Sequence, residues 1–296
     1  WKPENYGKKF YGPSTLRMGL EKSRNLMTVR IAQNLGLKKI VKFSKQLGIY
    51  DNPEELLSIS LGSAETTLIK LTSAYCSFVN GGKLVKPLII DRIQDSEGNT
   101  IFNTETRECN DCKKISYLSN DIPKISNNFK KIFSPETAYQ MTSILEGVIK
   151  RGTGRRLRDL NLDIGGKTGT TNNNTDAWFI GYTSDLIVGI YSGFDRPLSL
   201  GKRETGSSVA VPIFREIMGE HLSESVSLPF RVPPGIELIK TDINTGKIII
   251  NDNTNTIYEA FGKNDKLNPS SETLVGSKGF VPIQVNEISE DINLVY

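Results

Sequence analysis

The stretch Ile164-Gly-Gly-Lys-Thr-Gly-Thr-Thr171, followed closely by Asp176-Ala-Trp-Phe-Ile-Gly-Tyr182, decides the fold of this chain. The two runs predict strands near 163–171 and 176–183, and a third strand is expected near 186–194. The connection at 182–185 is tight, so we expect the second and third strands to be antiparallel neighbours. An antiparallel sheet is therefore the centre from which the rest of the fold is worked out.

Helical patterns precede and follow this sheet. Apolar residues at helical spacing, bounded by glycines and capping residues, predict helices over about 12–20, 28–35, up to 47, 67–80, 134–151 and 209–222. A strand over 84–93 should turn at 97–99 toward 101–102, and 237–242 should pair with 247–250 in a hairpin. Helices, an antiparallel sheet and a closing helix predict an α+β fold, a sheet flanked by helices.

The composition excludes several classes of protein. The chain has 296 residues, of which 37% are hydrophobic and 24% charged, enough for a substantial core. Its net charge of +4 is spread over scattered lysines without a basic-aromatic pattern, so no nucleic-acid partner is expected. No apolar run approaches the ~18 residues of a membrane span. We expect any membrane attachment to come from an N-terminal anchor outside this chain.

The cysteines give no convincing metal site. Cys109 and Cys112 are separated by two residues, and only Cys76 and His221 could complete a set of about four zinc ligands. A disulfide or a pair of free thiols is the favoured reading of Cys109 and Cys112, with zinc or a redox role as alternatives. Cys76 is expected on the apolar face of a helix, as a small core residue, and His221 is expected near the end of a helix. No metal and no cofactor is predicted.

The run Lys167-Thr-Gly-Thr170 suits the binding of an anionic acyl substrate. Lys167 supplies a compact positive charge, and Thr168 and Thr170 should project to one side because strand side chains alternate. Gly169 lets a ligand backbone approach closely, and the Thr170 amide can serve as one oxyanion donor. The alternative is a glycine-rich strand end with an exposed lysine.

Ser23 and Asn25 form a Ser-x-Asn element far upstream. They interrupt an otherwise continuous helical pattern, which indicates a loop held for a purpose. Helix capping is the alternative, since both residue types are good caps. Lys-Thr-Gly and a Ser-x-Asn element occur together in penicillin-binding proteins and class A β-lactamases.

Further motifs in order extend this resemblance, and the chain resembles the transpeptidase domain of bifunctional (class A) penicillin-binding proteins over about residues 1–221. The motifs are Gly12-Pro-Ser-Thr-Leu-Arg, Ser23-Arg-Asn, Leu61-Gly-Ser-Ala-Glu-Thr-Thr, Phe78-Val-Asn-Gly-Gly, Arg151-Gly-Thr-Gly, Gly166-Lys-Thr-Gly-Thr-Thr, Asp176-Ala-Trp-Phe-Ile-Gly-Tyr, Gly193-Phe-Asp, Gly206 and Pro212-Ile-Phe. We assign 1–221 to the C-terminal part of such a domain, with a polar insertion at about 95–132. Residues 222–296 form a C-terminal extension with a small hairpin and a tail expected to be partly disordered.

The resemblance implies a five-stranded antiparallel sheet shared with serine β-lactamases, and a cell-wall DD-transpeptidase on the periplasmic face of a bacterial inner membrane. Its partners would be peptidoglycan stem peptides, β-lactams and the upstream part of the same protein. By motif position, Ser23 would relay a proton, Asn25 would hold the substrate amide, and Lys167 would hold Ser23. Substrate binding falls to Thr168, Gly169, Thr170 and Thr171.

The sequence departs from the family at the nucleophile. Only 22 residues precede Ser23, and none of them forms the Ser-x-x-Lys motif of the family. The one formal match, Ser199-Leu-Gly-Lys202, follows the Lys-Thr-Gly strand in an expected loop and is read as coincidence. We therefore expect the nucleophile upstream and the chain alone to be inactive. Alternatives are a DD-carboxypeptidase or β-lactamase on the same fold, or a non-catalytic binding module.

Overall fold

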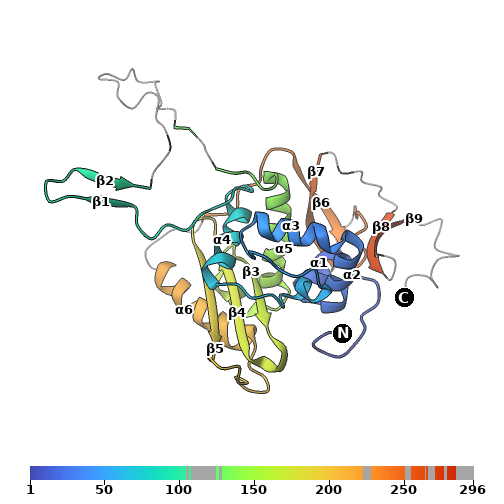
Figure 1. Cartoon of the computed structure of the whole chain (residues 1–296). Coiled ribbons are helices and arrows are strands. Elements are labelled where there is room, and N and C mark those ends of the chain that lie inside the picture. Colours follow the sequence, from blue (N-terminus) through green and yellow to red (C-terminus); the bar gives the residue numbers. More distant parts are fainter. Residues whose placement is uncertain are drawn as a thin grey trace.

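The computed structural model describes the chain except for residues 105–106, 108–124, 127–128, 223–227, 251–254, 264, 266–270, 277–278 and 285–296. Its centre is an antiparallel sheet of β3 (Gly165–Thr170), β4 (Asp176–Tyr182) and β5 (Ile187–Gly193), flanked by helices (Figure 1). The α+β arrangement expected from the sequence is confirmed. Over the described residues this sheet has three of the five strands that the resemblance implies.

The helices also lie close to their predicted positions. Thr67 and Ser134 cap two of them through their side chains, as capping chemistry favours. The second helix begins at Asn25, three residues before the predicted start. The helical elements are α1 (Leu16–Glu21), α2 (Asn25–Leu35), α3 (Leu37–Gln46), α4 (Leu68–Val79), α5 (Pro135–Lys150), α6 (Val211–Leu222), the short turns η1 (Leu57–Leu61), η2 (Arg155–Leu160) and η3 (Asn172–Asn174), and the π-helical turn η4 (Gly206–Ala210).

The two faces of the sheet are covered by different helices. On one face Phe179 stacks edge-to-face on Phe214 of α6. On the other, the Tyr182 hydroxyl donates to Thr142 of α5, and Gly189 abuts Thr72 of α4. Phe179, Tyr182 and Phe214 belong to one apolar cluster, and at about 25 cal/mol per Å² its burial is the main force holding the helices to the sheet.

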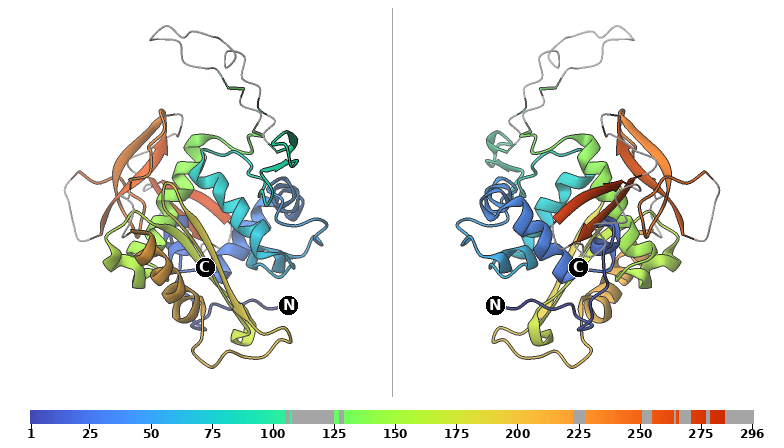
Figure 2. Two further views of the ribbon diagram at one scale, coloured as in Figure 1. Left: turned by 90° about the vertical axis from the view of Figure 1, so that its left-hand side faces the viewer. Right: turned by 90° about the vertical axis from the view of Figure 1, so that its right-hand side faces the viewer.

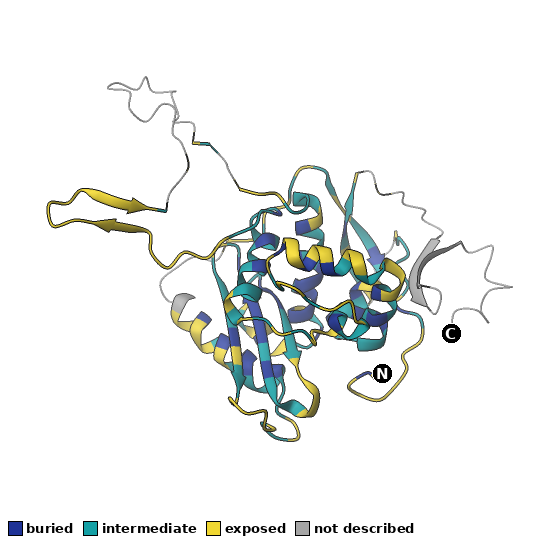
Figure 3. Cartoon of the chain, viewed as in Figure 1, coloured by how far each residue is buried: buried dark blue, intermediate teal, exposed yellow. Residues whose placement is uncertain are grey.

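The register of this sheet sets the direction of the Lys-Thr-Gly strand. Gly165 lies opposite Tyr182 and Thr170 opposite Ala177, and the pairing of β4 with β5 is antiparallel as predicted. The first two residues of β3 are buried, the next three are half-buried, and the last is exposed. The strand thus runs out of the core toward the surface, with its polar residues at the outer end (Figure 3).

Two predicted hairpins differ from those observed. The strand expected over 84–93 shrinks to β1 (Arg92–Gln94), which pairs with β2 (Thr100–Asn103). Neither strand has a buried residue, and the pair projects from the body (Figure 1); in the views of Figure 2 it is seen nearly end-on. Without a core to cover, only the residues next to the turn remain paired.

The second prediction, a hairpin of 237–242 with 247–250, is confirmed next to its turn, where the Asp242 amide donates to the Lys247 carbonyl at 2.9 Å and the Ile249 amide to the Lys240 carbonyl at 3.0 Å. The main partner of β6 (Ile236–Asp242) was not predicted: β7 (Thr256–Gly262) pairs along the whole strand, whereas Ile248 makes only an isolated bridge to Thr241. Tertiary contacts favour β7, because the Ala260 carbonyl accepts a hydrogen bond from Gln140 of α5. A further pair, β8 (Ser271–Gly276) and β9 (Gly279–Gln284), lies in the tail where little structure was expected.

Several sequence predictions concern residues outside this description. Cys109, Cys112 and most of the 95–132 insertion lie there, and so does the side chain of His221. Cys76 is on α4 as expected, half-buried, with its thiol directed at the Thr72 carbonyl, and burial raises its pKa. Among the helices described, none has the length and apolar character needed to span a membrane.

Candidate active site

Ser23 sits in a tight turn that ends α1. The helix begins at Thr15, whose hydroxyl accepts a hydrogen bond from the Met18 amide at 3.2 Å. At its other end the Ser23 amide donates to the Leu20 carbonyl at 3.1 Å, and the Arg24 amide to the Gly19 carbonyl at 2.8 Å. This pair of bonds is the Schellman helix ending, which places one residue in the left-handed region.

That left-handed residue is Ser23, with φ of 52°. Glycine is the usual choice there, because a Cβ in this conformation costs roughly 1–2 kcal/mol. Neither Ser23 nor Asn25 caps a helix through its side chain, since Arg24 is the N-cap of α2. A serine at a glycine position therefore points to a requirement for its hydroxyl.

The Ser23 hydroxyl meets Lys167 across the chain. Lys167 Nζ donates to Ser23 Oγ at 2.8 Å and to the Thr168 carbonyl at 2.9 Å. Burial lowers the pKa of Lys167 from its ordinary value of 10.5 to about 8. The contact between Ser23 and Lys167 expected from the sequence is present. A lysine whose pKa is perturbed by burial is also typical of functional sites.

Hydroxyl groups continue from this pair along β3. Thr168 Oγ1 is 2.7 Å from Thr153 Oγ1, and Thr170 Oγ1 accepts a hydrogen bond from the Gly206 amide at 3.0 Å. The Ser207 hydroxyl donates to the Thr153 carbonyl at 2.8 Å. The hydroxyls of Thr168 and Thr170 are thus held by two segments, the residues that follow α5 and the turn η4.

Gly206 allows η4 to approach the strand. A Cβ there would lie 2.3 Å from the Trp178 carbonyl oxygen and 2.5 Å from that of Gly169. No role was predicted from the sequence for Thr153, Gly206 or Ser207. Thr153 lies within the motif Arg151-Gly-Thr-Gly, and Gly206 is itself one of the motifs of the resemblance, so these two residues had a sequence signal.

Asn25 and Thr171 are placed less directly. The Asn25 side chain donates to the Glu4 carbonyl at 2.9 Å, so the N-terminal segment holds it. Thr171 lies beyond β3, where its hydroxyl accepts from the Asp176 amide at 2.8 Å and so stabilises the turn into β4. Ser199, from the coincidental Ser-x-x-Lys match, accepts the Gly201 amide at 3.2 Å within a loop. The structure joins Ser23 directly to Lys167 and leaves these three residues in supporting contacts.

The fold and the Ser-x-Asn and Lys-Thr-Gly elements define a class of protein, the serine transpeptidases that bind penicillin. The family model "Penicillin binding protein transpeptidase domain" matches residues 1–219, so the chain belongs to this family. It corresponds to a C-terminal part of a class A penicillin-binding protein.

Individual relatives agree with this assignment. Penicillin-binding protein 1A of Rickettsia bellii is 45% identical over 269 residues, 90% of this chain and 34% of the relative. The same protein of Pseudomonas aeruginosa is 33% identical over 305 residues, 93% of this chain and 37% of the relative. The crystal structure of penicillin-binding protein 1A from Haemophilus influenzae superimposes with a TM-score of 0.74 at 31% identity, covering 88% of this chain and 42% of that one. The chain spans about a third of the length of these curated relatives.

Proposed function

We propose that this chain supplies the substrate-binding and proton-relay half of a peptidoglycan DD-transpeptidase site. The observation that carries the proposal is the 2.8 Å hydrogen bond between Lys167 Nζ and Ser23 Oγ, 144 positions apart in sequence. Beside it, Thr168 and Thr170 present hydroxyls from one side of an edge strand. A cation, a relay hydroxyl and carboxylate-binding hydroxyls are what acyl transfer from a D-Ala-D-Ala end requires.

Each residue then has a defined task. Thr168 and Thr170 bind the terminal carboxylate of the stem peptide, with Gly169 giving the peptide backbone room and Thr171 holding the strand end. The Thr170 amide donates to the developing oxyanion. Asn25, once released from the Glu4 carbonyl, accepts or donates to the substrate amide.

The proton path runs through the Ser23 hydroxyl. During acylation, a nucleophilic serine gives up its hydroxyl proton and bonds to the carbonyl carbon, and the peptide C–N bond breaks. D-alanine leaves as an amine that takes a proton from Ser23, and the proton given up by the nucleophile restores the Ser23 hydroxyl. In the second step, an acceptor amine of a neighbouring peptidoglycan strand attacks the ester, and its proton returns along the same path to the serine. The ester bond is thereby exchanged for an amide. Lys167 keeps the Ser23 hydroxyl oriented, and its positive field stabilises the anionic states.

The nucleophile itself is proposed to come from a Ser-x-x-Lys motif outside this chain. Ser23 is not the first residue of a Ser-x-x-Lys motif, and the amine next to it, that of Lys167, donates to its hydroxyl instead of accepting its proton. We also propose, by analogy with the family, that the whole enzyme lies at the periplasmic face of a bacterial inner membrane. The activity therefore belongs to the full-length protein and not to this chain alone.

The experiment is acylation of the full-length protein by labelled penicillin, followed by product analysis with a stem peptide and an acceptor amine. We expect a stoichiometric ester and a cross-linked product. Lys167→Ala should slow acylation by about tenfold or more, since one lost charge-assisted hydrogen bond costs roughly 1.5–3 kcal/mol. Lys150→Ala is the matched control, because its ion pair with Glu146 lies at the surface of α5.

The outcomes separate the alternatives. Release of free D-alanine without cross-linked product identifies a carboxypeptidase, and rapid release of hydrolysed penicillin identifies a β-lactamase. Absence of any adduct on the full-length protein indicates a non-catalytic binding module. If Lys167→Ala melts well below the wild type yet keeps its acylation rate, Lys167 is structural and the proposed site is wrong.

A further inference from the structure

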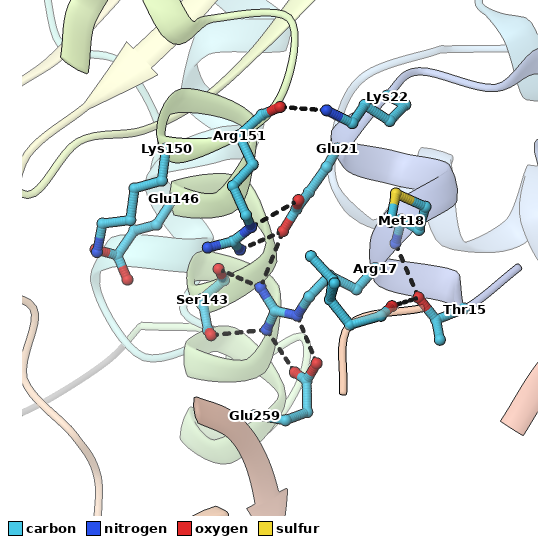
Figure 4. A network of polar contacts seen from close by, with 11 residues as sticks. Thr15, Arg17, Met18, Glu21, Lys22, Ser143, Glu146, Lys150, Arg151 and Glu259 are labelled. Carbon is cyan, nitrogen blue, oxygen red and sulfur yellow. Dashed lines mark hydrogen bonds and ion pairs between the residues drawn. The ribbon is translucent and has the colours of Figure 1, made fainter. Parts of the chain in front are cut away.

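An ion-pair network links the C-terminal extension to the helix that ends at Ser23. Figure 4 shows Arg17 of α1 between Glu259 of β7 and Glu21, with Arg151 at the far end. Arg17 is 4% exposed, Glu21 fully buried and Glu259 22% exposed. Two cations alternate with two carboxylates, so the buried charges compensate one another.

Arg17 is saturated with hydrogen bonds. Its Nε and Nη2 donate to the two carboxylate oxygens of Glu259, in the bidentate geometry that makes such pairs specific. Its remaining N–H groups go to the carbonyl and hydroxyl of Ser143 at 2.8 and 2.9 Å, and to Glu21 at 3.4 Å. Burial acts to lower the pKa of Arg17, but Glu259 and Glu21 hold it above its ordinary value. Every donor of this guanidinium thus has a fixed partner.

The next link attaches the end of α1 to α5. Glu21 accepts from Arg151 Nε at 3.1 Å and Nη2 at 2.5 Å. A Cβ at Gly147 would lie 1.8 Å from Glu21 Oε1, and one at Gly152 would lie 2.2 Å from the Glu21 carbonyl oxygen. Only glycines at these two positions let α1 seat its last turn so closely on α5.

This junction adjoins both halves of the candidate site. Ser23 follows Glu21 by two residues in the Schellman turn, and the Thr153 amide donates to the Glu21 carbonyl at 3.3 Å. Thr153 in turn contacts Thr168 through its hydroxyl at 2.7 Å. Any tilt of α1 on α5 would therefore move the Ser23 hydroxyl relative to Lys167 and disturb the support of Thr168.

We infer that Glu259 is a positioning residue for the transpeptidase site: through Arg17 and Glu21 it fixes α1 on α5 and so holds the Ser23 turn opposite Lys167. The family match ends at residue 219, so Glu259 lies outside the region that it describes. A second bond from α1 to the same extension, Thr15 Oγ1 to the Ile243 carbonyl at 2.9 Å, supports the docking. The inference rests on the proposed roles of Ser23 and Lys167, whereas the coupling to the turn can be measured independently of them.

The first test is amide hydrogen exchange on this chain with Glu259→Gln, which removes the charge at nearly constant shape. We expect the Ser23 and Arg24 amides to exchange about tenfold faster or more, because a loosened α1 opens the turn locally. Asp242→Asn is the matched control. Asp242 shapes the turn after β6 by accepting the amides of Asn244 and Thr245, at 2.9 and 3.0 Å, and neither of these bonds involves α1. Asp242→Asn should leave the exchange rates of the Ser23 and Arg24 amides within about twofold of the wild type.

The second test uses the full-length protein and separates binding of penicillin from the acylation step. Glu259→Gln should lower the acylation rate constant by about fivefold or more and leave the non-covalent dissociation constant within about twofold, as expected for lost orientation. Glu259→Asp, which keeps the charge, should recover part of the rate and replaces Glu259→Gln if the latter does not fold. Asp242→Asn should acylate at the wild-type rate.

Unchanged exchange at Ser23 and Arg24 in Glu259→Gln overturns the inference, and so does equal loss of acylation in Asp242→Asn. A different result tests the proposed function instead. If the wild-type protein is not acylated at all while Glu259→Gln still opens the turn, the coupling stands and the transpeptidase assignment fails.

Discussion

The half-buried Lys167 should make the stability of this chain rise with pH over a defined window. Its pKa is about 8 in the folded chain and 10.5 in its ordinary state, the value expected after unfolding. Between these values the unfolded chain binds a proton that the folded chain does not. Stability rises with pH wherever the unfolded state binds more protons, so the free energy of unfolding should increase from about pH 8 to 10.5.

The size of the effect follows from the same two values. Each pKa unit corresponds to about 1.4 kcal/mol, so the difference between 10.5 and about 8 amounts to about 3 kcal/mol. The perturbation that isolates it is Lys167→Met, which removes the titrating amine and keeps an unbranched side chain. We expect the free energy of unfolding of the wild type minus that of Lys167→Met to grow by about 3 kcal/mol over this range.

Urea unfolding followed by circular dichroism at closely spaced pH values measures this difference. Other groups oppose the trend, because burial raises the pKa of Tyr75 to about 12 and that of Tyr182 also, and above about pH 10 their folded forms retain protons. These groups are common to both proteins and cancel in the difference. A difference that stays flat within about 0.5 kcal/mol would show that Lys167 remains hydrated and charged, and the reasoning would fail.

Three further outcomes test the site. Intact mass after incubation of this chain alone with penicillin should show no covalent adduct, because Ser23 has no Ser-x-x-Lys amine; a stoichiometric adduct on any serine, Ser199 included, contradicts this. Ser23→Gly should be more stable to urea than Ser23→Ala by about 1 kcal/mol, because glycine accepts φ of 52° without a Cβ penalty; the reverse order would exclude strain at Ser23. Gly206→Ala should cost roughly 1–3 kcal/mol and lower the thermal midpoint, since its Cβ would meet the Trp178 and Gly169 carbonyls; an unchanged midpoint would mean that η4 moves away freely.

Local sequence was sufficient for the elements that carry their own signals. The helix at Pro135–Lys150 begins after Ser134 as its cap and proline predict, and the three sheet strands fall within the predicted ranges. The pairing of β6 with β7 was missed for the opposite reason. Residues 247–249 follow a good turn and do bond to β6, but β7 is held by contacts of Glu259 and Ala260 with helices more than a hundred positions upstream.

The candidate site likewise contains residues that the sequence could name and contacts that it could not. Ser23, Lys167, Thr168 and Thr170 could be named from residue type and motif order, because the chemistry of acyl transfer admits few alternatives. The motif Arg151-Gly-Thr-Gly draws attention to Thr153, but it does not indicate that the Thr153 hydroxyl reaches Thr168 on β3.

The sequence alone determined the class of fold and the strand with the cation and hydroxyls, and it led to the expectation of a nucleophile from elsewhere, because these depend on residue type and local periodicity. Tertiary structure alone decided that Ser23 adopts a left-handed backbone, that Lys167 loses water and shifts its pKa, and that Glu259 holds Arg17. These properties arise from burial and from contacts between segments distant in the chain. A local pattern carries no information about which distant group will come within hydrogen-bonding distance.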